Sequence, residues 1–207
     1  GFKNLDLADQ KKVDQKLIEL DSHSKLGANT ILAVSIASAR AAALTKRIPL
    51  WKYIADTYQT SPKMPLLFMN IINGGLHAGN ALRFQEYMAI PKAKTAKTSI
   101  DIGQKLYQAL KERLEENKGK GSSNVGDEGG FAPNCKTGQE PFELILAAAT
   151  KQALEGKIEL GLDAAASNVS LSAKALTSIY EDMFSKFPQF TYLEDAFGED
   201  DFDSFSA

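Results

Sequence analysis

The sequence of 207 residues has little of several features that assign a protein to a specialised class. It contains one cysteine, Cys135, so no intramolecular disulfide can form, and we expect a reducing compartment, the cytoplasm. Basic residues are not in excess: 24 Lys and Arg stand against 26 Asp and Glu, a net charge of -2. This balance argues against a dedicated nucleic-acid-binding protein.

Long apolar runs are also missing. The most apolar one, residues 26–39, ends at Arg40 and is too short for a membrane span, so we interpret it as part of a buried helix. The chain begins with Gly1 rather than Met, which indicates a fragment or a processed product. With 43% hydrophobic and 24% charged residues, the composition is that of a globular protein with one or two domains.

The front of the chain is predicted to be helical. Residues 8–20 place apolar side chains at helical spacing, with charged residues between them. Residues 25–46 are rich in Ala, Ser and Ile, which favours a helix packed closely on most sides, and Pro49 starts a shorter helix at 49–58. Residues 59–65 contain two prolines, so we place a domain boundary there.

The rest of the chain alternates between strand and helix patterns. Strands are predicted at 66–72, 84–90, 157–163 and 190–195, and helices at 99–118, 141–154 and 174–184. This alternation predicts an α/β fold in which a parallel sheet is covered by helices through right-handed crossovers. Four strands fit either an open sheet or half of an eight-stranded barrel.

Acidic side chains end two of these strands. Asp163 and Glu194 each follow an apolar run, at the edge where parallel α/β folds bind ligands. Two carboxylates that meet there repel each other, and a cation such as Mg²⁺ would favour their ionised forms. Alternatively, these acids only cap the following helices or face solvent.

Two loops carry further candidates. In NVGDEGGFAP, residues 124–133, glycines surround Asp127 and Glu128 and allow an unusual backbone; an ordinary glycine turn with solvated acids is the alternative. His77 lies in a glycine-flanked loop where it could transfer a proton, or it is a plain surface histidine. Gln85 and Glu86 follow in the next strand and would point to opposite faces if that strand is regular.

Five segments in this order resemble enolase, phosphopyruvate hydratase. They are SKLGANTILAVSIASARAAA, NIINGGLHAGNALRFQEYM, NVGDEGGFAPN, IELGLDAAAS and YLEDAFGEDD. The resemblance extends from about Ala8 to the end of the chain, and the HAGN and GDEGGFAPN strings are highly specific for that family. It implies a lyase of glycolysis that interconverts 2-phosphoglycerate and phosphoenolpyruvate with Mg²⁺ as cofactor.

The resemblance implies a role for each candidate residue. Glu128 matches the general acid that acts on the leaving hydroxyl, and Glu86 matches its partner near the same hydroxyl and the substrate. His77 matches a catalytic histidine on a mobile loop that closes over the substrate, and Gln85 matches a substrate-contacting glutamine.

The resemblance also implies metal ligands and an architecture. Asp163 and Glu194 match the first two ligands of the higher-affinity Mg²⁺. The implied fold is a partial (β/α) barrel of the enolase type, preceded by a helical remnant of the N-terminal capping domain. Residues 1–62 would belong to that N-terminal domain, and residues 63–207 to the first half of the barrel. At full length we expect a homodimer that binds a small-molecule substrate, without nucleic acid or membrane partners.

Some family features have no match in these residues. The base lysine and the third metal aspartate would lie beyond the point matching Ala207, and N-terminal strands would precede Gly1. Ala196 stands where enolases usually carry proline, and residues 167–175 are shorter than the family's loop. The main interpretation is a partial enolase. The alternatives are a truncated, non-catalytic binding or scaffold protein, and a different dehydratase or racemase on the same barrel.

Overall fold

A computed structural model describes residues 5–6, 8–21, 25–126 and 128–206. The chain forms two compact units, Gly1–Lys63 and Met64–Ala207. Asp127, a predicted member of the glycine-rich loop, lies outside the described residues, as does the side chain of His77.

The first unit contains three helices, as the sequence predicts. They are α1 (Gln10–Leu20), α2 (Ala28–Thr45) and α3 (Leu50–Tyr58). The Asp9 side chain caps α1 by accepting a hydrogen bond from the Lys12 N–H. A small core joins the helices around Ala39, Ala42 and Tyr53, whose hydroxyl donates to the Ala8 carbonyl at 2.9 Å.

The prediction that α2 packs closely on most sides is wrong for the described residues. Its buried positions are confined to Ser38, Ala39, Ala42 and Ala43, while Leu44 is 77% exposed. The reason is that only α1 and α3 pack against it within this unit. Among the described residues, α2 is the one helix long and apolar enough to cross a membrane. This is weak evidence for a span, because the core helix of a soluble protein meets the same requirement.

The second unit is built on a four-stranded sheet in the order β1-β2-β3-β4. The strands are β1 (Met69–Asn73), β2 (Glu86–Pro91), β3 (Ile158–Asp163) and β4 (Phe190–Glu194). The helices are α4 (Ala96–Lys118), α5 (Glu140–Lys151), α6 (Ala173–Lys186) and α7 (Phe202–Ser206). Short 3-10 turns are η1 (Gly75–His77), η2 (Lys120–Ser123) and η3 (Ala166–Asn168).

The prediction of a wholly parallel sheet is wrong. β1 pairs with β2 and β2 with β3 in antiparallel fashion, and only β3 and β4 are parallel. The connections explain this. A loop over residues 74–85 reverses the chain between β1 and β2, and the two helices α4 and α5 separate β2 from β3. A single helix, α6, lies between β3 and β4, so the chain returns in the same direction.

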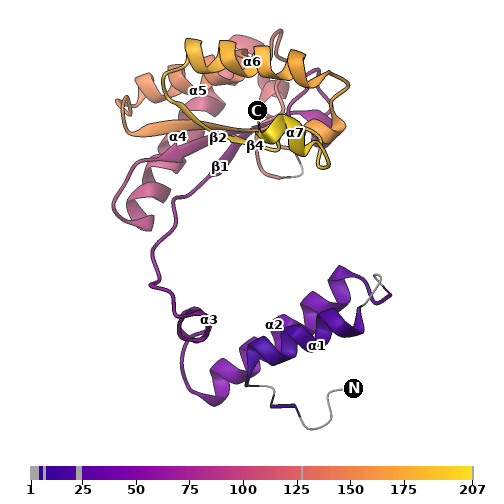
Figure 1. The fold of residues 1–207 in the computed structure, drawn as a ribbon. Helices are drawn as coiled ribbons and strands as arrows, with labels where there is room; N and C mark the ends of the chain where they lie inside the picture. The colour runs from indigo at the N-terminus through magenta and orange to yellow at the C-terminus, as the bar shows by residue number, and fades with distance from the viewer. Residues whose placement is uncertain (1–4, 7, 22–24, 127, 207) are drawn as a thin grey trace. The chain divides into compact units, whose positions relative to one another are not determined.

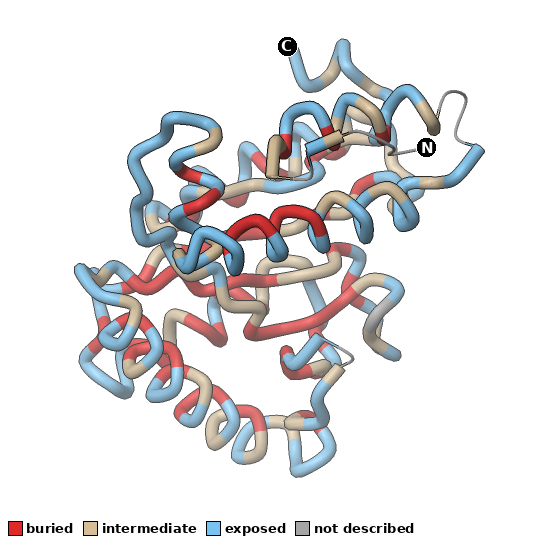
Figure 2. Tube along the Cα trace, turned by 90° about the horizontal axis from the view of Figure 1, so that it is seen from below, coloured by how far each residue is buried: buried red, intermediate tan, exposed pale blue. Residues whose placement is uncertain are grey.

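One face of the sheet packs on the helices, and α5 and α6 lie above the strands in Figure 1. Tyr87 and Ala89 of β2 and Leu160 and Leu162 of β3 are fully buried in this core. Figure 2 shows buried residues along the strands and alternating with exposed ones along the helices. Because strand side chains alternate, Glu86 points to the opposite face, away from the helices.

Cys135 should be an unreactive thiol in the folded protein. Burial, with a smaller contribution from the Glu140 charge, raises its pKa from 9.0 to about 11. With this higher pKa, about 100-fold less of the Cys135 thiol is ionised at pH 8. The ionised form, the thiolate, is the nucleophile. We therefore expect iodoacetamide to modify Cys135 at least about 100-fold more slowly in buffer than in concentrated urea. Peptide mapping would measure both rates, and equal rates would contradict the buried placement.

Candidate active site

Three carboxylates form a row across the open face of the sheet. Glu86 is the register partner of Asp163, and Asp163 is the partner of Glu194 on the next strand. Partners on neighbouring strands project to the same face, so the three side chains are neighbours. Asp163 and Glu194 end parallel strands, as predicted. Glu86 instead begins β2 and joins them because β2 runs in the opposite direction.

The backbone that follows these strands is tightly turned. Ala165 has φ 42° and Asp195 has φ 47°, left-handed values that are unfavourable for residues with a Cβ. The two turns are tied together, since the Ala166 N–H donates to the Asp195 carbonyl at 3.0 Å. Strained residues of this kind cluster at functional sites, where the surrounding structure holds them.

The Asp163 carboxylate is held by its own turn. Its Oδ1 accepts a hydrogen bond from the Ala165 N–H at 2.9 Å, and its Oδ2 accepts one from Gln85 Nε2 at 3.4 Å. Burial raises the pKa of Asp163, the Ala165 N–H opposes that shift, and the charges of Glu194 and Asp195 add to it. The carboxylate is thus fixed in direction and surrounded by like charge.

Glu194, at the end of the row, is more exposed. The Tyr192 hydroxyl donates to its Oε2 at 3.0 Å, and this hydrogen bond is the largest cause of a raised pKa for the tyrosine. Tyr192 therefore fixes one oxygen of Glu194, as the Ala165 N–H fixes one oxygen of Asp163.

Glu86 meets the fourth carboxyl group, that of Glu128. The pKa of Glu86 is raised from 4.5 to about 7, first by burial and next by the charge of Glu128 and a hydrogen bond with it. Asp163 and Glu194 contribute smaller effects of the same sign. Two carboxyl groups that share a site in this way can hold one proton between them, which is what general acid–base chemistry requires.

Glu128 reaches this position on the glycine-rich loop. The Gly126 N–H donates to the Gly130 carbonyl at 2.8 Å and closes the loop. Phe131 then adds to β1, its N–H donating to the Ile71 carbonyl and its carbonyl accepting from the Asn73 N–H. This arrangement differs from a free glycine turn because the loop is closed on itself and Phe131, at its end, is attached to the sheet.

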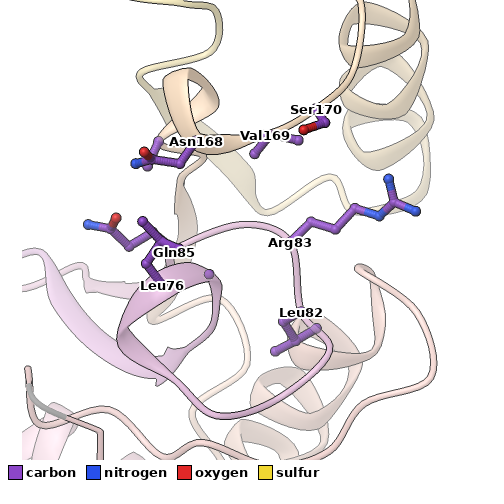
Figure 3. Close-up of a pocket in the computed structure, with 9 residues that line it drawn as sticks. Leu76, Leu82, Arg83, Gln85, Asn168, Val169 and Ser170 are labelled. Carbon is purple, nitrogen blue, oxygen red and sulfur yellow. The ribbon is translucent and has the colours of Figure 1, made fainter.

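Gln85 precedes β2, so the predicted alternation with Glu86 does not apply to it. It lines a pocket of about 240 Å³ in which residues of the 75–85 loop face residues 165–170 (Figure 3). His77 ends η1 in the first of these loops, next to the pocket-lining Leu76. The pocket therefore adjoins the carboxylate row through the Gln85–Asp163 hydrogen bond.

The donor set fits a divalent cation only in part. Within the described ranges, no three His, Cys, Asp or Glu side chains are arranged as a ready metal site. Asp163 and Glu194 nevertheless supply adjacent oxygen ligands of the kind that Mg²⁺ prefers. Among the ion pairs that the structure describes, none involves Glu86, Glu128, Asp163 or Glu194.

Family comparisons agree with this geometry. The profile of the family "Enolase, C-terminal TIM barrel domain" matches residues 61–170, more than half of the chain. The profile of the "Enolase, N-terminal domain" family matches residues 2–54. The chain belongs to the enolase family. Its second unit is accordingly part of a barrel of the enolase type.

Curated enolases are similar along nearly the whole chain. The enolase of Methanocaldococcus jannaschii is 41% identical over 212 residues, covering 95% of this chain and 49% of that protein. The enolase of Methanococcus vannielii is 42% identical over 217 residues, covering 97% of this chain and 50% of that protein. The chain thus spans about half the length of the curated enolases it matches.

Some residues that shape this site were not singled out from the sequence. Asn80 donates to the Asn73 carbonyl at 3.0 Å and to the Pro133 carbonyl at 3.2 Å, so it links the His77 loop to β1 and to the end of the Glu128 loop. Tyr192, two residues before Glu194, could have been noticed because alternation puts both on one face. Asn80 gives no comparable signal, because its partners are distant backbone carbonyls.

Proposed function

We propose that the protein to which this chain belongs catalyses the reversible dehydration of 2-phosphoglycerate to phosphoenolpyruvate. The observation that carries the proposal is the row of Glu86, Asp163 and Glu194 on one face of the sheet. Glu128 lies close enough that its charge helps to raise the pKa of Glu86. Removal of water from 2-phosphoglycerate needs a proton for the leaving hydroxyl and a positive charge near the substrate carboxylate. The Glu86 and Glu128 carboxyl groups can supply the proton, and the Asp163 and Glu194 carboxylates can bind a cation.

In this proposal Glu128 is the general acid. It gives a proton to the hydroxyl that departs. Glu86 holds a second proton near neutral pH that can replace it, because burial and the charge of Glu128 raise the pKa of Glu86 to about 7. Gln85 and His77 bind the substrate on the side of the adjoining pocket. The base that takes the carbon-bound proton is not assigned to any residue of this chain.

The proposed cofactor is Mg²⁺, held by Asp163 and Glu194 together with ligands from elsewhere. When bound, the ion supplies the charge that stabilises the enolate as the proton leaves. The Ala165 N–H and the Tyr192 hydroxyl would orient the two carboxylates toward it.

We also propose that residues 1–62 belong to the N-terminal domain and residues 63–207 to the barrel.

Replacing Asp163 by asparagine in the full-length protein tests this proposal. The substitution keeps the shape and removes one anionic ligand. Loss of a residue that only hydrogen-bonds to a metal ligand lowers metal affinity about 10–100-fold. Loss of charge on a direct ligand should cost more, so we expect the Mg²⁺ concentration for half-maximal activity to rise by about 100-fold or more. Formation of phosphoenolpyruvate across a Mg²⁺ titration measures this.

The matched control is Asp101→Asn on α4, where the half-exposed carboxylate pairs with Lys97 among the residues that the structure describes. It should leave the Mg²⁺ requirement unchanged. A shift of equal size in both variants, or an unchanged requirement in Asp163→Asn, would contradict the assigned ligand. A wild-type protein without dehydration activity would instead support a binding or scaffold role.

A further inference from the structure

Two asparagine side chains lie on the same face of the sheet as the carboxylate row, and the roles above use neither. Asn70 is the register partner of Met88, and Asn73 that of Glu86. They are three residues apart, so a regular strand would point them to opposite faces. The register shift between Asn70 and Ile72 is the irregularity that brings both to the face of Glu86.

The Glu128 loop lies directly on these two amides. A Cβ at Gly126 would come within 2.9 Å of Asn73 Nδ2. A Cβ at Gly130 would overlap Asn73 Oδ1 and lie 2.7 Å from Asn70 Oδ1. Neither glycine has a positive φ, so close approach rather than backbone freedom explains why these positions lack a side chain.

Hydrogen bonds connect the same asparagines to the loop. Asn70 Nδ2 donates to Glu128 Oε2 at 3.4 Å, and the Asn73 N–H donates to the Phe131 carbonyl at 2.8 Å. Asn73 is completely buried, and neither end of its side-chain amide has a partner among the described residues. An apolar side chain would fill the place of Asn73 at less cost in desolvation. The presence of an asparagine there therefore needs a reason other than packing.

We propose that Asn70 and Asn73 are positioning residues for Glu128. Their amides form the surface on which Gly126 and Gly130 rest, and the Asn70 amide holds the carboxyl group of Glu128 within reach of Glu86. A general acid acts only from within hydrogen-bond distance of its target, and a glycine-rich loop alone does not fix such a distance. This inference rests on the proposed dehydration of 2-phosphoglycerate.

A double-mutant cycle separates positioning from general stability. In the full-length protein, Asn70→Ala should lower kcat about 10-fold with little change in KM, the size expected for one hydrogen bond. In a Glu128→Gln background the same change should have no further effect. Asn70→Asp should be more damaging than Asn70→Ala, because a carboxylate cannot donate and repels Glu128. Independent, additive losses, or an Asn70→Asp variant as active as wild type, would overturn the proposal.

The glycine contacts give a second test. Gly130→Ala should lower kcat by about 10-fold or more, because the new methyl group displaces the loop from the asparagines. Gly121→Ala is the matched control: a Cβ there meets nothing within 4 Å, and activity should be unchanged. Equal activity of Gly130→Ala and wild type would contradict the contact.

Hydrogen exchange tests the positioning role of the two asparagines even if the wild-type protein lacks the proposed activity. The Gly126 N–H closes the loop, so Asn70→Ala and Asn73→Ala should each speed its exchange by about 10-fold or more. The Leu162 amide in β3 should stay as protected as in wild type, which excludes global unfolding. Unchanged exchange at Gly126 would overturn the positioning role.

Discussion

Replacing Glu128 by glutamine is expected to lower kcat for phosphoenolpyruvate formation by about 10²–10⁴-fold, the usual contribution of a general acid. Glutamine keeps the size of the side chain and can still accept a weaker hydrogen bond from Asn70. It has no acidic proton to give to the leaving hydroxyl. KM should change much less, because binding of the substrate does not depend on that proton. Steady-state kinetics of the full-length protein measures both parameters.

Glu181→Gln is the matched control for this experiment. Glu181 lies exposed on α6, a helix that packs on the opposite face of the sheet from the carboxylate row. Its replacement should leave kcat within twofold of wild type. If Glu128→Gln retained the wild-type kcat, Glu128 could not be the general acid.

Replacing Phe142 by alanine is expected to destabilise the second unit by about 3–5 kcal/mol, the range for aromatic residues deleted from a core. Phe142 is completely buried, and its ring lies 5.3 Å from Tyr87, 5.5 Å from Phe187 and 5.1 Å from Phe190. It therefore joins α5 to β2, to the end of α6 and to β4. Its loss leaves a cavity that three neighbouring rings cannot easily fill.

Native-state hydrogen exchange measures this effect within the full-length protein. The Leu160 and Leu162 amides lie in the core strand β3 and report its opening free energy. Phe202→Ala is the control, since Phe202 is 71% exposed on α7 and its removal should cost less than about 0.5 kcal/mol. A cost for Phe142→Ala no larger than that of the control would contradict the described core.

The sequence predicted the elements and much of the site because both depend on local pattern. Helical spacing predicted α4 at 99–118, and the structure has Ala96–Lys118, where Thr95 adds an N-terminal cap. Apolar runs that end in acids placed Asp163 and Glu194 at strand ends, and β3 and β4 are parallel neighbours there. The glycine-rich loop marked Glu128 as a candidate, and the resemblance added its role and its partner Glu86, which nothing in the loop itself indicates.

Strand direction and long-range contacts could not be predicted in this way. The sequence predicted both helices between the second and third strands, but the number of connecting helices does not by itself fix strand direction. The antiparallel pairing of β2 with β3, which brings Glu86 to Asp163, was therefore missed. The bulge in β1 that turns Asn70 toward the Glu128 loop has no marker in the sequence. Likewise, the composition of α2 indicates a helix but not what covers it.

The most direct test of the central claim is the conversion of 2-phosphoglycerate by the full-length wild-type protein, followed by phosphorus NMR with and without a chelator. We predict phosphoenolpyruvate in the presence of Mg²⁺, approach to the same equilibrium from either substrate, and loss of turnover when the ion is removed. A purified, folded full-length protein that forms no phosphoenolpyruvate at saturating Mg²⁺ would contradict the assignment of the carboxylate row as an active site.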